Sequence, residues 1–476
     1  MTGYLSFNIG SSAVRYAAAF IQTIIIARML PLDMMGNFYF ILSIFFIASQ
    51  IAEAGLGRGI IKFYHIHTAN RAGLVLLASA MVTAGGLLLS MILICTASYS
   101  QSWIPNGSSE TVMMFAYIIP LMAVVKLFGN CLRAAERVVL RNIWINLVGP
   151  LLLCIILACG YSAGVHTVRT IITAYYISYC VAGAGMAYHI IRILHIKPAD
   201  IISKAGDSVR FFKEVMFFSA TLLAGNMLSM FMEKTDIIML GILALSSDIG
   251  IYSAAVRVAF ISIFPLLCFI QIFENRMSRL TAEQNYEKLN TLYINITFYI
   301  SFAALTAALL TVIFGSEVLR LFGPEFSQGY LCIVILLTGR LASALSGPNG
   351  SLLIYTGKER FITVTNGLMV AVNVIGNSIL VPLYSYEGAA CATAVSVSGV
   401  NLLRSAMLYK KTGILPFSRK YWINTSAFLT AAIIWLLLPG SISDHISVKI
   451  LYAAVFLVAA AGLNRKELFA LKRLDV

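Results

Sequence analysis

Long apolar segments follow one another along the chain, and short polar or basic stretches separate them. Each segment holds about 20 mostly apolar residues, the length that an α-helix needs to cross a bilayer. Transmembrane β-strands would instead show alternating runs of about 10 residues. The pattern therefore predicts an all-α polytopic membrane protein with about 14 transmembrane helices. The predicted spans are 7–29, 36–54, 73–98, 111–132, 142–160, 168–191, 214–242, 249–273, 291–315, 329–355, 361–382, 387–409, 422–438 and 448–463.

The composition supports this membrane pattern. Of the 476 residues, 59% are hydrophobic and only 11% are charged, which is about half the charged share of a soluble domain. This balance excludes a soluble enzyme and a nucleic-acid-binding protein, although a net charge of +14 alone would suggest an acidic polymer partner. Residues 1–10 lack the basic start of a secretory signal, so we expect the first span to be retained.

The positive charges alternate along the predicted loops. The even-numbered loops and the C-terminal tail hold 25 of the 34 Lys and Arg residues, and the odd-numbered loops hold four. Those four are Arg28, Arg169, Arg320 and Lys449. Because Lys and Arg are retained on the cytoplasmic side, the even-numbered loops and both termini are expected to be cytoplasmic. Lys204 and Arg473 should then lie inside the cell, and Ser100 and Ser443 outside.

The remaining five cations lie inside predicted spans and are the candidate residues for binding an anionic substrate. They are Arg15, Lys126, Lys234, Arg257 and Arg340. A charge near the bilayer centre costs about 2.5–3.5 kcal/mol on insertion scales, so each one needs a partner or a water-filled cavity. Lys126 and Lys234 could instead extend to a helix end. Arg340 lies about 16 Å deep, where this is harder.

Two segments that are 214 residues apart resemble each other. Residues 30–39 and 244–253 each place a glycine, Gly36 or Gly250, two positions before an aromatic residue. Both copies run outward before a turn and inward after it, so the repeats are expected to be parallel, with a pseudo-two-fold axis along the membrane normal. The predicted domains are an N-terminal six-helix lobe (1–195), a cytoplasmic basic linker (196–213), a C-terminal six-helix lobe (214–413) and an appended helix pair with a basic tail (414–476). Lys197, Lys204 and Arg210 of the linker are expected to lie along anionic lipid headgroups.

The same offset aligns polar faces on the first and seventh spans. The first face holds Asn8, Ser11, Ser12, Arg15 and Gln22, and the second holds Asn226, Ser229, Glu233 and Asp236. Such faces line a transport path or hydrogen-bond to neighbouring helices, and both interpretations stay open. We expect a polar cavity stripe of Ser12, Gln22, Asn226 and Ser229. Glu233 and Asp236 are candidates for ion coupling, and one of them is expected to pair with Arg257.

The tenth span is interrupted by polar and helix-breaking residues. They are Gly347, Pro348, Asn349 and Gly350. Glycine and proline leave backbone polar groups without helical hydrogen-bond partners. A membrane tolerates such groups only where they contact protein or water. Interrupted helices mark binding sites in transporters, so this break is a candidate site. A structural kink without ligand contact is the alternative.

Short motifs spread over most of the chain carry a family resemblance. In the first half they are Ala27-Arg28-Met29-Leu30-Pro31, Gly36-Asn37-Phe38-Tyr39 and Glu53-Ala54-Gly55-Leu56; in the second half they are 236–241, 250–255, 321–326, 381–384, 388–390 and 392–394. Together they resemble the bacterial polysaccharide flippases, of the Wzx type, in the multidrug/oligosaccharidyl-lipid/polysaccharide exporter superfamily. The lipid II flippase branch has a longer acidic signature where this chain has Phe20-Ile21-Gln22-Thr23, which counts against a peptidoglycan precursor as cargo.

The resemblance implies two six-helix lobes around a central cleft, so the thirteenth and fourteenth helices depart from the commonest pattern. It also implies alternating-access transport of undecaprenyl-diphosphate-linked oligosaccharides to the outer leaflet of the bacterial inner membrane, for O-antigen, capsule, teichoic-acid or exopolysaccharide synthesis. The implied partners are the lipid-linked substrate, membrane lipids and other assembly proteins such as the polymerase. A diphosphate cargo would suit the five intramembrane cations.

The sequence contains no phosphate-binding loop, no Cys-x-x-Cys pair and no cluster of metal ligands. We therefore expect no catalytic residues, no metal and no cofactor, with H+, Na+ or the cargo flux itself as the energy source. The stretch 55–59, rich in glycine, is expected to be a loop at a helix end. Two alternatives stay open: a drug/cation antiporter of the same superfamily, which Glu233 and Asp236 would suit, and a membrane-embedded polymerase or transferase.

Overall fold

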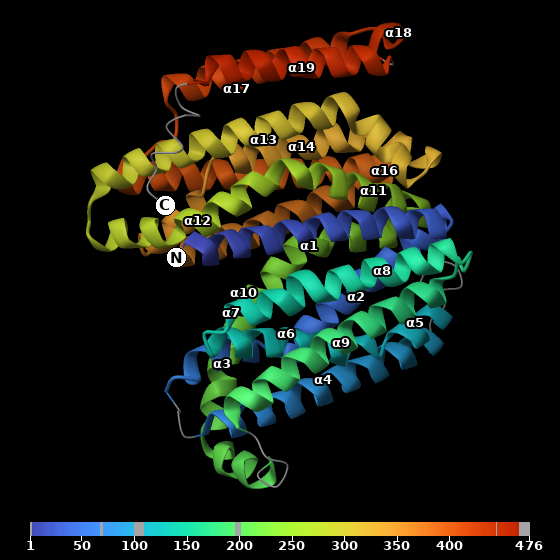
Figure 1. Ribbon diagram of the computed structural model, residues 1–476, viewed down its shortest axis with the longest axis vertical. Coiled ribbons are helices and arrows are strands. Elements are labelled where there is room, and N and C mark those ends of the chain that lie inside the picture. Colours follow the sequence, from blue (N-terminus) through green and yellow to red (C-terminus); the bar gives the residue numbers. More distant parts are fainter. Residues whose placement is uncertain (1, 67–69, 100–108, 196–200, 444, 466–476) are drawn as a thin grey trace. The chain divides into compact units, whose positions relative to one another are not determined.

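The computed structural model describes residues 2–66, 70–99, 109–195, 201–443 and 445–465, whose path is shown in Figure 1. All regular secondary structure among these residues is helical, which confirms the all-α prediction. Ten of the helices there are long and apolar enough to cross a membrane, and the bent pair α5–α6 makes an eleventh candidate. Every predicted span coincides with one helix or with consecutive helical segments. The protein is therefore a polytopic membrane protein.

The chain divides into two compact units, Gly3–Gly250 and Ile251–Val476. The first contains α1 (Thr2–Met29), α2 (Leu32–Glu53), α3 (Leu56–Phe63), α4 (Arg71–Tyr99), α5 (Ser109–Phe115), α6 (Ile118–Ala134), α7 (Val138–Asn142), the π-helical turn η2 (Ile143–Val148), α8 (Gly149–Ser162), α9 (Val168–Leu194), α10 (Ile201–Leu243) and the start of α11 (Ser246–Ala259). Helix α10 packs against α2, α3 and α4, although its span was assigned to the C-terminal lobe. The predicted lobe boundaries and their symmetry stay a prediction.

The two copies of the repeated glycine motif meet inside the first unit. A Cβ atom at Gly36 would lie 1.7 Å from the backbone oxygen of Ser246, and one at Gly250 would lie 2.8 Å from Leu32 Cδ1. The Ser246 hydroxyl also donates to Asn37 Oδ1 at 2.6 Å. The backbones touch because neither glycine carries a side chain, so here the motif is a packing device.

The prediction of a loop at 55–59 was wrong. Only Ala54 and Gly55 form the turn, with φ values of 52° and 72°, and α3 begins at Leu56. A left-handed residue reverses the chain in one step, which glycine does at little cost. Leu56, Ile60 and Phe63 then repeat at helical spacing on a buried face, and this face stabilises the short helix.

The second unit contains the rest of α11, the 3₁₀ turn η4 (Phe260–Ile263), α12 (Phe264–Ala282), α13 (Tyr286–Phe322), the 3₁₀ turn η5 (Pro324–Gly329), α14 (Tyr330–Leu345), α15 (Asn349–Tyr355), α16 (Glu359–Thr412), α17 (Arg419–Leu437), α18 (Gly440–Ser443) and α19 (Ile446–Leu463). Two predicted spans fall on α16, which folds back on itself at Ser385, where φ is 48° and ψ is −128°. The preceding Pro382 lacks the amide hydrogen that a continuous helix would use. Helices α17 and α19 pack on α13, with Phe302 and Phe428 in edge contact at 6.0 Å.

Candidate functional site

Two of the five intramembrane lysines and arginines converge on one aromatic ring in the first unit. The Lys126 ammonium, on α6, lies 6.0 Å from the centroid of the Phe46 ring on α2. The Lys234 ammonium, on α10, lies 5.0 Å from the same centroid. The two charges are thus at most about 11 Å apart, the sum of these distances. Three helices therefore place two cations at one point of the membrane-spanning unit.

A chain of hydrogen bonds joins Lys126 to a buried carboxylate. The Lys126 ammonium donates to Ser49 Oγ at 2.9 Å and to Gln50 Oε1 at 3.4 Å. Gln50 Nε2 donates in turn to Glu53 Oε2 at 3.3 Å, and Asn130 Nδ2 donates to Glu53 Oε1 at 3.1 Å. Glu53 is 5% exposed. The carboxylate is thus held by neutral amides, one of which it shares with Lys126.

The local sequence explains this arrangement. Ser49, Gln50 and Glu53 lie in the last turn and a half of α2, at spacings that give them one face. Lys126 and Asn130 are four residues apart on α6, so both face that turn. Glu233 of α10 is also close enough to Lys126 to interact with it electrostatically. The site therefore balances two ammonium groups against two carboxylates, which lowers the cost of keeping the charges in a membrane.

Glu53 is a candidate that the sequence analysis named only within a family motif. An acidic residue at the end of an apolar span was the available signal. Its partners on α6, 73 or more residues further along the chain, could not be identified from spacing. The structure adds Glu53, Gln50 and Asn130 to the site that Lys126 and Lys234 define, and we call these five residues the α2–α6–α10 cluster.

Part of the predicted polar stripe on α1 connects helices. Gln22 Nε2 donates to the backbone oxygen of Pro150 at 2.8 Å, and Asn142 Nδ2 donates to Asn8 Oδ1 at 2.7 Å. These two contacts agree with the helix–helix alternative, whereas the Ser12 hydroxyl donates within α1, to the Asn8 backbone oxygen at 2.8 Å. The side chains of Asn226 and Ser229, like Lys197 and the side chains of Lys204 and Arg210, lie outside the described residues.

The three predicted arginines lie on α1, α11 and α14. The guanidinium of Arg15 lies 4.6 Å from the Tyr16 ring centroid and donates to Tyr16 Oη at 2.9 Å. Arg340, on α14 of the second unit, lies 5.9 Å from the Phe260 ring centroid. Arg257 is on α11 in the second unit, whereas Glu233 and Asp236 are on α10 in the first. Their predicted pairing would join the two units and stays a prediction.

The break in the tenth span is held by protein contacts. Tyr293 Oη donates to the backbone oxygen of Ser346 at 2.7 Å. Asn349 is 3% exposed, and its Nδ2 donates to the Asn401 backbone oxygen at 3.2 Å and to Ser405 Oγ at 3.1 Å. Gly347 adopts a φ of 65°, and Pro348 and Gly350 follow it at the start of α15. These bonds satisfy polar groups at the break, as the structural-kink alternative requires.

Similar folds occur among solved transporter structures. The lipid II flippase MurJ in an inward closed conformation matches with a TM-score of 0.75 and 11% identity, over 96% of this chain and 98% of that chain. An inward-facing multidrug resistance MATE family transporter of the MOP superfamily matches with a TM-score of 0.68 and 13% identity, over 87% and 95%. A MOP superfamily transporter from Pyrococcus furiosus matches with a TM-score of 0.57 and 14% identity, over 87% and 95%. At these identities the likeness is one of fold.

Sequence comparisons complete the assignment. Comparison with curated protein sequences gives no match. The profile of the family described as "Polysaccharide biosynthesis protein" matches residues 5–272, which is more than half of the chain. The protein therefore belongs to the polysaccharide biosynthesis protein family, on a fold that it shares with transporters of the MOP superfamily.

Proposed function

We propose that this protein is a flippase that moves undecaprenyl-diphosphate-linked oligosaccharides from the cytoplasmic to the outer leaflet of a bacterial inner membrane. The family concerns polysaccharide synthesis, and the fold resembles that of membrane transporters, including the lipid II flippase MurJ. The observation that carries the proposal is the convergence of Lys126 and Lys234 on Phe46. Two ammonium groups near one ring suit a ligand with two neighbouring negative charges, and a diphosphate is such a ligand.

Glu53 of the cluster and the neighbouring Glu233 of α10 give this site two states. Without cargo, Glu53 and Glu233 balance the lysines, so that no cation is left alone in the membrane. A diphosphate would compete with these carboxylates for the same ammonium groups. The cargo then binds more tightly to the conformation in which both lysines are accessible to it. This difference in affinity between the two conformations is what shifts an alternating-access equilibrium.

The test is export by lysine variants in a strain from which the protein has been deleted. Lys126→Gln and Lys234→Gln together should lower surface polysaccharide by about 100-fold, because two charge-assisted hydrogen bonds are lost, each worth about 1.5 kcal/mol or more. Lipid-linked repeat units should accumulate on the cytoplasmic leaflet. Lys288→Gln, which removes an exposed cation near the start of α13, is the matched control and should export normally.

Three outcomes would contradict the proposal. Full export by the double lysine variant at a normal protein level would show that the cluster does not bind the cargo. Formation of glycosidic product by the purified protein would favour the polymerase or transferase alternative. Transport of cationic drugs without binding of lipid diphosphate would favour the antiporter.

A further inference from the structure

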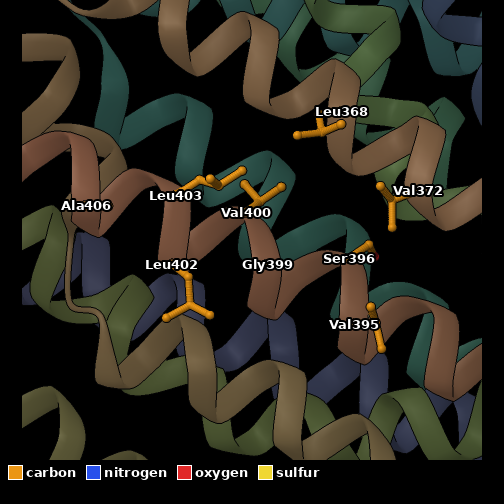
Figure 2. Close-up of a pocket in the computed structure, with 9 residues that line it drawn as sticks. All are labelled: Leu368, Val372, Val395, Ser396, Gly399, Val400, Leu402, Leu403 and Ala406. Atoms are coloured by element: carbon orange, nitrogen blue, oxygen red, sulfur yellow. The ribbon is translucent and has the colours of Figure 1, made fainter.

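An apolar groove runs between the two antiparallel segments of α16, as Figure 2 shows. Its volume is about 600 Å³, and its walls include Leu368 and Val372 from the first segment and Val395, Val400 and Leu403 from the second. An apolar hollow of this kind holds neither an ion nor a sugar, because it offers them almost no hydrogen bonds. Its chemistry is that of a hydrocarbon chain.

Polar contacts bracket the groove at both ends. At one end Asn373 Nδ2 donates to Thr393 Oγ1 at 3.0 Å. At the other, Arg404 Nε donates to Thr365 Oγ1 at 3.1 Å, and Arg404 Nη2 donates to Asn366 Oδ1. These bonds fix the spacing of the two segments, so the hollow between them is built into the fold.

Gly399 keeps the groove open in its middle. A Cβ atom there would meet nothing within 4 Å, so the space beside it is empty. Leu402 and Val395, at the rim, are 70% and 63% exposed. Helix α16 is one of the helices apolar enough to cross a membrane, and exposed apolar side chains at the rim suit contact with lipid acyl chains.

Basic residues gather at the end of the groove where α16 begins and ends. Lys358 and Arg360 flank the start of the helix, and Lys410 and Lys411 lie in its last turn, with Glu359 as the one acidic residue among them. The topology predicted from the loop charges places this end in the cytoplasm, where anionic headgroups lie. The second segment of the groove, residues 395–406, is about 16 Å long, which suits an acyl chain below such a headgroup.

We propose that this groove is a binding site for an anionic phospholipid, with one acyl chain between the segments of α16 and the phosphate at Lys410 and Lys411. Charge complementarity favours an anionic lipid over a zwitterionic one. Because basic residues lie at the end of the same helix, the proposed occupant is a bilayer phospholipid and not the tail of a cargo whose diphosphate is held elsewhere. The site therefore stands independently of the proposed function.

The experiment uses the full-length protein in nanodiscs that contain a trace of phosphatidylglycerol with a diazirine in its acyl chain. After illumination, mass spectrometry measures adducts on residues 395–406 relative to adducts on α19. Unlabelled phosphatidylglycerol should lower the α16 adducts about fivefold or more, whereas phosphatidylcholine at the same concentration should not. Equal competition by the two lipids would overturn the proposal. Stronger competition by undecaprenyl phosphate would also overturn it, because the groove would then belong to the carrier lipid.

Two variants test the groove itself. Gly399→Leu fills the hollow and should reduce the adducts on 395–406 about fivefold, because the acyl chain loses its place. Gly462→Leu is the matched control, since a Cβ atom at that glycine of α19 also meets nothing within 4 Å. Lys410→Gln with Lys411→Gln leaves the groove intact and should abolish the preference for phosphatidylglycerol. Wild-type labelling in Gly399→Leu, or an unchanged preference in the lysine pair, would each refute the assignment.

Discussion

Lys126 and Glu53 are opposite charges that the first unit connects through the amide of Gln50. A bridging amide satisfies both groups and leaves each one able to change partner, because no tight ion pair has to be broken first. Asn130 supports the carboxylate from the other side. At the scale of residues, the cluster is therefore suited to exchange an internal partner for an external anion.

Replacing Gly57 with alanine should disturb this arrangement without removing any of its polar groups. A Cβ atom there would lie 2.1 Å from Asn130 Nδ2 and 2.2 Å from Glu53 Oε1, so both must move. We expect Gly57→Ala to lower export about tenfold, as Glu53→Gln should, since about 1.4 kcal/mol of positioning is lost. Gly10→Ala, on α1 with nothing within 4 Å of the new atom, is the control. Normal export by Gly57→Ala would show that Glu53 positioning is unimportant.

At the scale of elements, a buried ion pair holds the last helix in place. The Lys449 ammonium of α19 lies 2.5 Å from Glu317 Oε1 of α13, and the two side chains are 7% and 31% exposed. At the other end of α19, Asn424 and Asn464 exchange side-chain hydrogen bonds of 2.8 and 2.9 Å. Polar contacts at both ends thus fix the register of α17 and α19, which otherwise present mostly apolar surfaces.

Removing Lys449 should destabilise the protein. Lys449→Met leaves the Glu317 carboxylate without its partner, which costs about 3 kcal/mol in a buried pair. The thermal unfolding midpoint of the purified protein should fall, and Lys449→Met with Glu317→Met should recover most of the loss. Arg169→Met is the control, because Arg169 and Glu110 form a pair at 3.6 Å with side chains 72% and 75% exposed, and exposed pairs contribute little. An unchanged midpoint in Lys449→Met would show that the pair does not stabilise α19.

At the scale of the whole molecule, the same two pairs bear on the predicted topology. Arg169 and Lys449 are two of the four basic residues that the charge pattern placed outside, and each has an acidic partner, Glu110 or Glu317. The rule that orients spans counts Lys and Arg and gives acidic partners little weight, so the two exceptions are outweighed by the 25 cations of the other loops and are not cancelled by their pairs. The exceptions are therefore compatible with cytoplasmic termini, which stay a prediction.

Coupling between the two units is the remaining prediction at this scale. Glu233→Gln, Asp236→Asn and Arg257→Gln should each lower export at external pH values from 6 to 8, because each removes a member of the predicted pair. Export is measured for each variant alone and for the variants in combination, at controlled protein levels. If all three variants export at the wild-type rate across this range, neither the pairing nor the coupling role survives.

The sequence alone determined the fold class and the order of the apolar helical segments along the chain. These follow from one constraint, since a backbone in lipid must satisfy its own hydrogen bonds and a helix of about 20 apolar residues does so locally. It also determined which cations need an explanation, because a charge inside a span is costly wherever it lies. Lys126 and Lys234 were identified in this way.

Only the tertiary structure decided which of those charges meet. Lys126, Lys234 and Glu53 lie on three helices far apart in the chain, and their convergence depends on how α2, α6 and α10 pack. For Gln22, named from spacing, and Asn349, named from the helix break, the sequence left a site role and a structural role open, and the structure shows that both side chains hydrogen-bond to neighbouring helices. The spacing of residues in the sequence determines which side chains share one face of a helix, because helical geometry is local. What that face meets is set by contacts between distant residues, and no local pattern encodes them.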